Sequence, residues 1–165
     1  MFPVDDAAAG PLELGASISY PHDNPRVAIY RREHFNAAHR IFNPALSDAD
    51  NARVYGKCSR PNFHGHNYEL TVRVSGAVDP LVGYVMDLGE LSAIVKAHVL
   101  DRFDHMNLNL DVPEFGTVIP TAENIAIVVH GILRPLIPAH LDVHVILGET
   151  PRNTAQYPAD ILVAL

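Results

Sequence analysis

Strict alternation of apolar and polar residues makes residues 64–76 the clearest strand in the chain. Every second side chain from position 68 is apolar: Tyr68, Leu70, Val72 and Val74. Because successive side chains of a strand point to opposite faces, this segment should bury one face and expose the other. Less regular strands are expected at 28–39, 141–147 and 155–165.

Two segments between these strands have helical spacing instead. Asp87 stands three residues before Glu90, an acidic variant of the capping box that opens a helix. Thr121, which follows Pro120, is the candidate N-cap of the second helix. The apolar positions behind each cap repeat every three or four residues: Leu91, Ile94, Val95 and Val99 in the first helix, and Ile125, Val128, Val129 and Ile132 in the second.

The order strand, strand, helix, helix, strand, strand predicts an α+β domain, a four-stranded antiparallel sheet with both helices on one face. Residues 26–165 would form this single domain. Residues 1–25 mix Pro, Gly, Ala and Asp without a sustained period and are expected to be a loose N-terminal extension. Residues 41–63 are rich in Asn, Asp, Ser and Pro, which predicts one long loop of the kind that is usually functional.

The composition limits the classes of function. The chain has 165 residues, of which 48% are apolar and 19% charged, and this suits one globular domain and excludes a disordered chain. A formal net charge of −7 argues against general nucleic-acid or anionic-membrane binding but leaves room for a local basic pocket. A single cysteine, Cys58, indicates a reducing compartment, and no run is apolar enough to span a membrane, so a cytoplasmic protein is expected.

The sequence His64-Gly65-His66 is the strongest candidate for chemistry. Side chains two apart on a strand point the same way from Cα atoms roughly 6.6–6.8 Å apart, so two imidazoles can converge on one ion. A third histidine would complete a catalytic zinc arrangement, which leaves a fourth position open. His39 and His34 are both candidates, and spacing alone does not choose between them. The alternative is that these histidines are structural and bond to the backbone.

Cys58 lies six residues before His64, in the predicted loop. Lys57, Arg60 and a nearby divalent cation would lower the pKa of its thiol and make thiolate available as a general base. The alternative is an inert, small apolar side chain, which describes most single buried cysteines.

Two further acidic positions are weaker candidates. Asp104 and His105 follow the first predicted helix, where His105 could equally well cap the C-terminus. Glu149 follows the strand 141–147, where a buried carboxylate could accept two hydrogen bonds from a planar pair of N–H groups. From the residues alone, a solvated loop acid is the favoured interpretation of Glu149.

Six motifs, in order, resemble the 6-pyruvoyl tetrahydropterin synthase family and its close relative, 6-carboxytetrahydropterin synthase. They are FNAAHR (35–40), YGKCSRPNFHGHNYEL (55–70), GYVMDLGEL (83–91), FDHMNLNLDVPEF (103–115), PTAENIA (120–126) and GETPRN (148–153). Together they cover most of residues 27–157, and the block from the cysteine to HGHNY is highly specific.

The resemblance implies a role for each candidate residue. Three imidazoles would hold zinc, a cysteine would be the general base with an Asp–His pair as its proton relay, and a glutamate would anchor the 2-amino-4-oxo edge of a pterin beside a recognition loop. In this sequence the zinc ligands would be His39, His64 and His66, the catalytic residues Cys58, Asp104 and His105, and the substrate-binding residues Glu149, Thr121 and Glu123.

The resemblance also implies a fold, an assembly and a substrate. In the T-fold (tunnelling fold) of this family, three subunits close a twelve-stranded barrel, two barrels stack into a homo-hexamer, and the relay pair reaches the cysteine from a neighbouring subunit. The substrate would be 7,8-dihydroneopterin triphosphate, with Arg40, Lys57 and Arg60 as candidates for its triphosphate. Two departures are modest: Ala122 replaces a hydroxyl residue of some members, and Gly148 stands where many relatives carry Tyr.

The product stays open between two branches of this family. The pyruvoyl-forming branch carries five residues between the cysteine and HGH, and the carboxy-forming branch usually carries three. Residues 59–63 make five, which favours the pyruvoyl product. A non-catalytic pterin- or metal-binding module and a zinc hydrolase are the remaining hypotheses, and the hydrolase gives no use to Glu149 or to a cysteine beside the ion.

Overall fold

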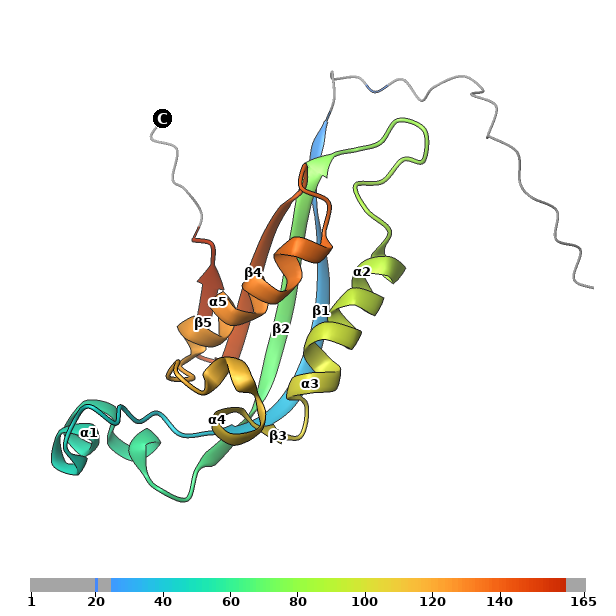
Figure 1. Cartoon of the computed structure of the whole chain (residues 1–165). Helices are drawn as coiled ribbons and strands as arrows, with labels where there is room; N and C mark the ends of the chain where they lie inside the picture. Colours follow the sequence, from blue (N-terminus) through green and yellow to red (C-terminus); the bar gives the residue numbers. More distant parts are fainter. Residues whose placement is uncertain (1–19, 21–24, 160–165) are drawn as a thin grey trace, which may run out of the picture.

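The computed structural model describes residue 20 and residues 25–159. In this part, the chain forms one sheet in the order β3-β1-β2-β4-β5, and the helices α2 and α5 cover one of its faces (Figure 1). The strands are β1 (Arg26–His39), β2 (His64–Ala77), β3 (Met106–Asn107), β4 (Asp142–Thr150) and β5 (Asn153–Tyr157). The α-helices are α1 (Asp48–Tyr55), α2 (Leu88–Val95), α3 (Asp101–Phe103), α4 (Leu108–Asp111) and α5 (Ala122–Leu133). Shorter helical turns are η1 (Gly56–Ser59), η2 (Lys96–Leu100), η3 (Pro113–Phe115) and η4 (Arg134–Leu136).

The four predicted strands are confirmed as an antiparallel set. β1 and β2 pair along their whole length, with Arg26 opposite Ala77 and His39 opposite His64. β4 pairs with β2, and β5 with β4, in the same sense. A two-residue strand, β3, adds a short parallel pairing to β1 that the sequence pattern did not signal, because two residues have no period.

The structure changes the bounds of the last predicted strand, and it does not describe most of the residues at the two ends of the chain. The last strand, expected over 155–165, begins at Asn153 and ends at Tyr157. Pro158 follows it, and a proline has no N–H to continue the ladder. Residues 160–165 and nearly all of the predicted extension 1–25 lie outside the described residues.

Both predicted helix starts are confirmed. The carboxylate of Asp87 accepts hydrogen bonds from the backbone N–H groups of Gly89 and Glu90 at the start of α2. The hydroxyl of Thr121 accepts one from Asn124 at the start of α5. The first helical stretch runs from α2 through the π-helical turn η2 into α3, and it buries a side chain at every fourth position: Leu91, Val95, Val99 and Phe103.

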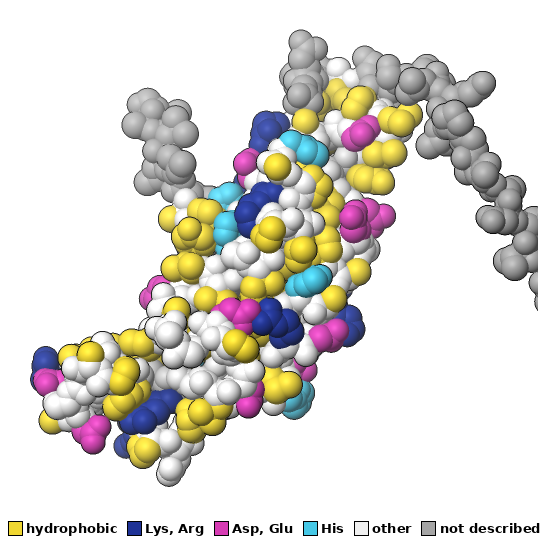
Figure 2. Space-filling view, viewed as in Figure 1, with side chains coloured by type: hydrophobic (Ala, Val, Ile, Leu, Met, Phe, Trp, Pro, Cys, Tyr) yellow, Lys and Arg dark blue, Asp and Glu magenta, His cyan; other side chains and the backbone are white. Residues whose placement is uncertain are grey.

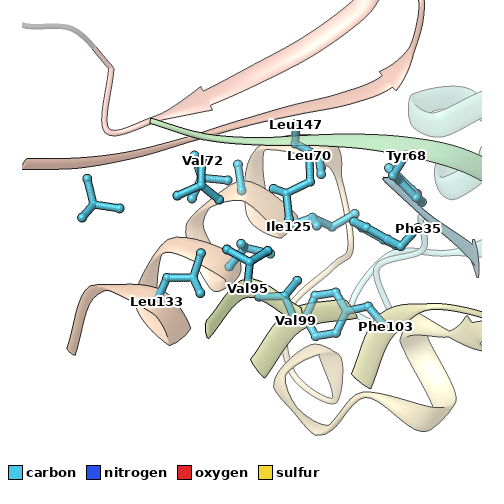
Figure 3. Close-up of a cluster of buried hydrophobic side chains, with 14 of the residues drawn as sticks. Phe35, Tyr68, Leu70, Val72, Val95, Val99, Phe103, Ile125, Leu133 and Leu147 are labelled. Carbon is cyan, nitrogen blue, oxygen red and sulfur yellow. The ribbon is translucent and has the colours of Figure 1, made fainter. Parts of the chain in front are cut away.

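The core lies between the sheet and these helices. Figure 3 shows apolar side chains of β1, β2 and β4 meeting those of α2, η2, α3 and α5. Phe35 stacks on Tyr68 with ring centroids 4.9 Å apart, and Phe103 packs edge-on against Phe35 at 5.9 Å. Burying each such side chain stabilises the fold by roughly 1.5–3 kcal/mol, so the sheet is held firmly on its helix-covered face.

The prediction of an irregular loop over 41–63 was wrong in part. The segment contains α1, whose N-cap Ser47 accepts a hydrogen bond from the backbone of Asp50, followed by the 3-10 turn η1. α1 buries only Asn51, so it has no apolar stripe from which to predict it. Within the described residues, no helix is long and apolar enough to cross a membrane.

Candidate metal centre

One end of the sheet gathers three histidines on the face that carries the core. Strand alternation places His39 in line with Phe35 on β1, and His64 and His66 in line with Tyr68 on β2. His39 and His64 are also direct partners in the strand register. The period that buries the apolar side chains therefore brings the three imidazoles together where the strands end.

The three rings present nitrogens to a common point. One ligand atom from each of His39, His64 and His66 lies within 4.8 Å of the others, and the Nε2 atoms of His39 and His64 are 3.0 Å apart. Two nitrogens that each lie ~2.05 Å from a tetrahedral ion are about 3.3 Å from one another. The three histidines could therefore hold a metal ion.

His66 supplies an independent test of that fit. Its Nε2 is buried and has no hydrogen-bond partner among the described residues. A buried polar atom without a partner costs free energy, and native proteins leave few of them. A cation at the cluster would give this nitrogen a partner, so the three histidines fit a bound metal ion.

His39 is oriented by its other ring nitrogen. The ring is fully buried, and its Nδ1 lies 2.8 Å from the carbonyl oxygen of Pro120 and 3.2 Å from the Tyr68 hydroxyl. A carbonyl only accepts, so Nδ1 carries the proton and Nε2 keeps a lone pair for a metal. Burial lowers the pKa of His39 to about 4, and the bond to Pro120 only partly opposes it, so the ring is neutral at pH 7.

Burial also lowers the pKa of His64, helped by the charge that His66 would carry and opposed by Glu149. Neutral imidazoles are the form that binds a metal. Spacing had left His34 open as the third ligand. The structure places His34 on the opposite face of β1, exposed and beside Glu69, so His39 completes the cluster.

Glu149 is a member of this site and not a solvated loop acid. It lies on β4, two residues after the buried Leu147, with its side chain 16% exposed. Its Oε1 is 3.7 Å from Nε2 of His39 and 4.0 Å from Nε2 of His66. A carboxylate in this position can accept hydrogen bonds from a ligand that sits against the histidines.

Cys58 lies on the turn η1, which follows α1. It is a free, half-buried cysteine, and its carbonyl accepts a hydrogen bond from Ile41, just beyond the end of β1. Burial raises the pKa of Tyr68, and the charges of Glu149 and Cys58 raise it further. The thiol therefore lies within electrostatic reach of the tyrosine that supports His39.

Asp104 and His105 form a pair at the edge of β1. His105 Nδ1 lies 2.9 Å from Asp104 Oδ2, and the backbone of Asn36 bonds both residues, donating to Asp104 Oδ1 at 2.8 Å and accepting from His105 at 2.6 Å. The Asn36 N–H lowers the pKa of Asp104. Within the described chain, no hydrogen bond or ion pair joins this pair to Cys58. One subunit therefore assembles the pair but not the predicted triad.

The recognition-loop residues lie beside the cluster through Pro120. Thr121 follows this proline directly, and its hydroxyl is engaged as the α5 N-cap. Glu123 is exposed in the first turn of α5. Sequence reasoning missed the supporting roles of Tyr68 and Pro120; the alternation His64, His66, Tyr68 could have pointed to the tyrosine, but nothing local points to the carbonyl.

The fold and the three-histidine cluster together define a T-fold protein with a candidate metal centre. The 6-pyruvoyl tetrahydropterin synthase family model matches residues 28–160 of the chain, which therefore belongs to this family. A protein of Homo sapiens named 6-pyruvoyl tetrahydrobiopterin synthase is 38% identical over 132 residues, 80% of this chain and 91% of that protein.

Two further matches are a solved structure and a relative named for a second activity. The solved structure of Caenorhabditis elegans 6-pyruvoyl tetrahydropterin synthase matches with a TM-score of 0.78 and 41% identity, covering 83% of this chain and 98% of that one. A Halobacterium salinarum protein named probable 6-carboxy-5,6,7,8-tetrahydropterin synthase is 35% identical over 116 residues, 61% of this chain and 72% of that protein.

Proposed function

We propose that this protein is a zinc-dependent lyase that converts 7,8-dihydroneopterin triphosphate to 6-pyruvoyl-tetrahydropterin and releases triphosphate. The observation that carries the proposal is the convergence of three imidazoles beside the carboxylate of Glu149. The names of the relatives, 6-pyruvoyl tetrahydrobiopterin synthases at 38–39% identity over 132 residues, support the same activity.

Each residue has a task that its surroundings suit. His39, His64 and His66 would hold the zinc, which when bound would polarise the hydroxyl groups of the substrate side chain and make the adjacent C–H more acidic. Glu149 would accept hydrogen bonds from the planar N–H groups of the pterin and so place the side chain against the histidines. Thr121 and Glu123, at the start of α5, would border the ring.

Cys58 would take the proton as thiolate, with Asp104 and His105 as the relay that removes it. Return of the proton to the ring reduces the pterin at the expense of its own side chain, so no external reductant is consumed. Expulsion of triphosphate makes the sequence irreversible in practice. Two hydrogen bonds with the backbone of Asn36, one donated to Asp104 and one accepted from His105, already fix the relay within one chain.

A homo-hexamer would bring the relay of one subunit to the cysteine of its neighbour. Two observations support this assembly: Asp104 and His105 lie at the edge of β1, and the His105 side chain is 78% exposed in a single chain. The single domain over 26–165, the loose extension 1–25 and a cytoplasmic location are parts of the same proposal.

The product of the zinc-loaded protein and 7,8-dihydroneopterin triphosphate tests this function. Mass spectrometry should find 6-pyruvoyl-tetrahydropterin together with free triphosphate, without an added redox cofactor. Cys58→Ala should abolish turnover while pterin binding persists, because Glu149 and the histidines are untouched. Turnover by that variant would remove Cys58 as the base, and binding without turnover by the unsubstituted protein would leave a binding module.

The second candidate is the 6-carboxy-5,6,7,8-tetrahydropterin product from the same substrate. The Halobacterium salinarum relative named for that activity favours keeping it. The same mass spectrum distinguishes the two, because the carboxy product has lost more of the side chain.

A further inference from the structure

A second concave site is formed by the segment 40–61 that connects β1 to β2, around α1 and η1. Its volume is about 560 Å³, within the range of small-ligand pockets, and its walls include Arg40, Lys57 and Arg60 together with Asp48 and Asn51. Three cationic side chains face one carboxylate here, in a chain whose formal net charge is −7. Figure 2 shows Lys and Arg surface beside α1 at this end of the molecule.

Among the described residues, these three cations have no carboxylate partner, whereas five of the twelve Lys and Arg side chains have one. Arg26 is paired with Asp142 at 2.6 Å and Lys96 with Asp101 at 2.5 Å. In the described part of the chain, no carboxylate oxygen lies within 4.0 Å of the charged nitrogens of Arg40, Lys57 or Arg60. Their charge is therefore available to an anion from outside the chain.

Arg40 is held in place and still has donors to give. Its Nε donates to the carbonyl of Ser59 at 2.7 Å, and its guanidinium lies 3.9 Å from the ring centroid of Phe42. Asn109 fixes its backbone from both sides, accepting from its N–H and donating to its carbonyl. The two terminal nitrogens of Arg40 donate to no described residue, and a fixed guanidinium fork suits phosphate oxygens.

Hydrogen bonds also hold the part of the wall formed by Asn51 in place. Asn51 is 1% exposed, and its side-chain amide donates to the carbonyls of Asn43, Leu46 and Ser47 and accepts from the N–H of Asn43. These bonds tie the segment 43–47 to α1. The hollow is therefore formed before any ligand binds, which lowers the entropy cost of binding.

Chain continuity links this hollow to the reaction centre. Arg40 directly follows His39, and Arg60 stands four residues before His64. Lys57 and Ser59 line the hollow, and Cys58 stands between them in the sequence. The turn η1 therefore carries both a cation of the hollow and the proposed general base.

We propose that this hollow binds the triphosphate of the substrate through Arg40, Lys57 and Arg60. The inference rests on the function proposed above and adds where the leaving group is held. With the pterin at Glu149 and the phosphates in the hollow, the substrate side chain spans the histidines and passes Cys58. The cations would also stabilise the charge that the departing triphosphate acquires.

Calorimetric titration of the zinc-loaded protein with inorganic tripolyphosphate tests the site without turnover. The double variant Lys57→Gln/Arg60→Gln should bind tripolyphosphate about tenfold more weakly for each lost charge-assisted contact. It should bind dihydroneopterin, which has no phosphate, as the unsubstituted protein does. Zinc content after each titration verifies that the polyanion has not removed the metal.

A matched control removes the same charge elsewhere. Arg26→Gln/Lys96→Gln disrupts two surface ion pairs, which are worth little, and should leave tripolyphosphate affinity within about twofold. The weaker affinity of the first variant then reports the hollow and not the net charge. Equal weakening in both double variants would overturn the proposal.

Substrate kinetics test whether the hollow binds the triphosphate of this substrate or only free polyphosphate. They also distinguish a failure of this proposal from a failure of the proposed function. In the Lys57→Gln/Arg60→Gln variant, the KM for 7,8-dihydroneopterin triphosphate should rise by a factor similar to the loss of tripolyphosphate affinity. An unchanged KM would overturn the assignment to this substrate, even with tripolyphosphate binding lost. Failure of the unsubstituted protein to release triphosphate, with tripolyphosphate still bound in the hollow, would instead count against the proposed function.

Discussion

At the scale of single residues, His39 and His66 show two different ways of preparing a ligand. Pro120 fixes the proton of His39 on Nδ1, so Nε2 is aimed by a backbone carbonyl. His66 has no such partner at Nε2, and this nitrogen is buried. The ring of His39 is oriented whether or not a metal is present, whereas a bound cation would give Nε2 of His66 its partner.

Replacing His66 by Ala should therefore abolish stoichiometric zinc binding. Only two imidazoles would remain, and the atom that most needs a cation would be gone. Zinc in the purified protein, measured by elemental analysis, should fall from one per chain to a small fraction. His34→Ala is the matched control, because His34 lies on the other face of β1 and should keep the full zinc content. Equal loss in both variants would contradict the assigned cluster.

The sequence predicted part of this site, namely the part that depends only on the spacing of neighbouring residues. The His-x-His spacing predicts convergence because strand side chains have a period of two. The choice of His39 over His34 depends on which face of β1 the helices cover, and that is a tertiary property. The burial of Glu149 likewise depends on the pairing of β4 with β2, so the residues around it favoured a solvated acid.

At the scale of elements, the helices α2 and α5 were predictable because a cap and an apolar stripe coincide. α1 has the cap without the stripe, and β3 is too short for any pattern. β2 followed from clear alternation and β1, β4 and β5 from less regular patterns, but the end of β5 at Tyr157 depended on Pro158. The long elements that pack against the core could thus be predicted from the sequence, whereas short ones could not, even where α4 and η3 add Leu108 and Phe115 to the core.

The N-cap of α2 gives a direct test at this scale. Asp87→Ala removes the acceptor for the N–H groups of Gly89 and Glu90, so the free energy of unfolding should fall by about 1 kcal/mol. Asp87→Asn keeps an acceptor oxygen and should recover most of it. Urea unfolding at one fixed protein concentration measures both, and an unchanged midpoint in Asp87→Ala would contradict the capping role.

The packing of α5 against β5 predicts a pH dependence. Burial lowers the pKa of His130, Arg134 and His144 lower it further, and a bond to the backbone of Val143 partly opposes this. Between the folded and the unfolded pKa, His130 is therefore protonated in the unfolded chain and neutral in the folded chain. The stability from neutral His130 is present in full above about pH 6.5 and is lost as the pH falls below that value toward the folded pKa.

His130→Gln should accordingly lose less stability than the unsubstituted protein between about pH 7.5 and about pH 5.5. His98 is exposed, so His98→Gln should keep the original loss. Urea unfolding at the two pH values provides the comparison. A steeper loss in His130→Gln would show that the sign of the shift is wrong.

At the scale of the whole molecule, a single chain lacks one contact that the proposed chemistry needs. Asp104 and His105 are bonded to β1, and Cys58 lies on η1. No pattern within one sequence reveals which residues of two copies meet. The sheet could therefore be predicted from one sequence, whereas the assembly is implied only by the family.

Mixed assemblies test that contact. Cys58→Ala and Asp104→Asn should each be inactive alone, since each lacks part of the proton path. Co-expressed in equal amounts, they should regain about a quarter of the unsubstituted activity, because random neighbours place an intact cysteine beside an intact relay at that frequency. Triphosphate release measures it, and complete inactivity of the mixed assembly would indicate that each subunit uses its own relay.

The most direct measurement is a zinc titration of metal-stripped protein with triphosphate release as the readout. If His39, His64 and His66 hold the ion at which 7,8-dihydroneopterin triphosphate reacts, activity should be near zero without zinc. It should then rise in proportion to added zinc and level off at one equivalent per chain. Full activity in the stripped protein would contradict the account.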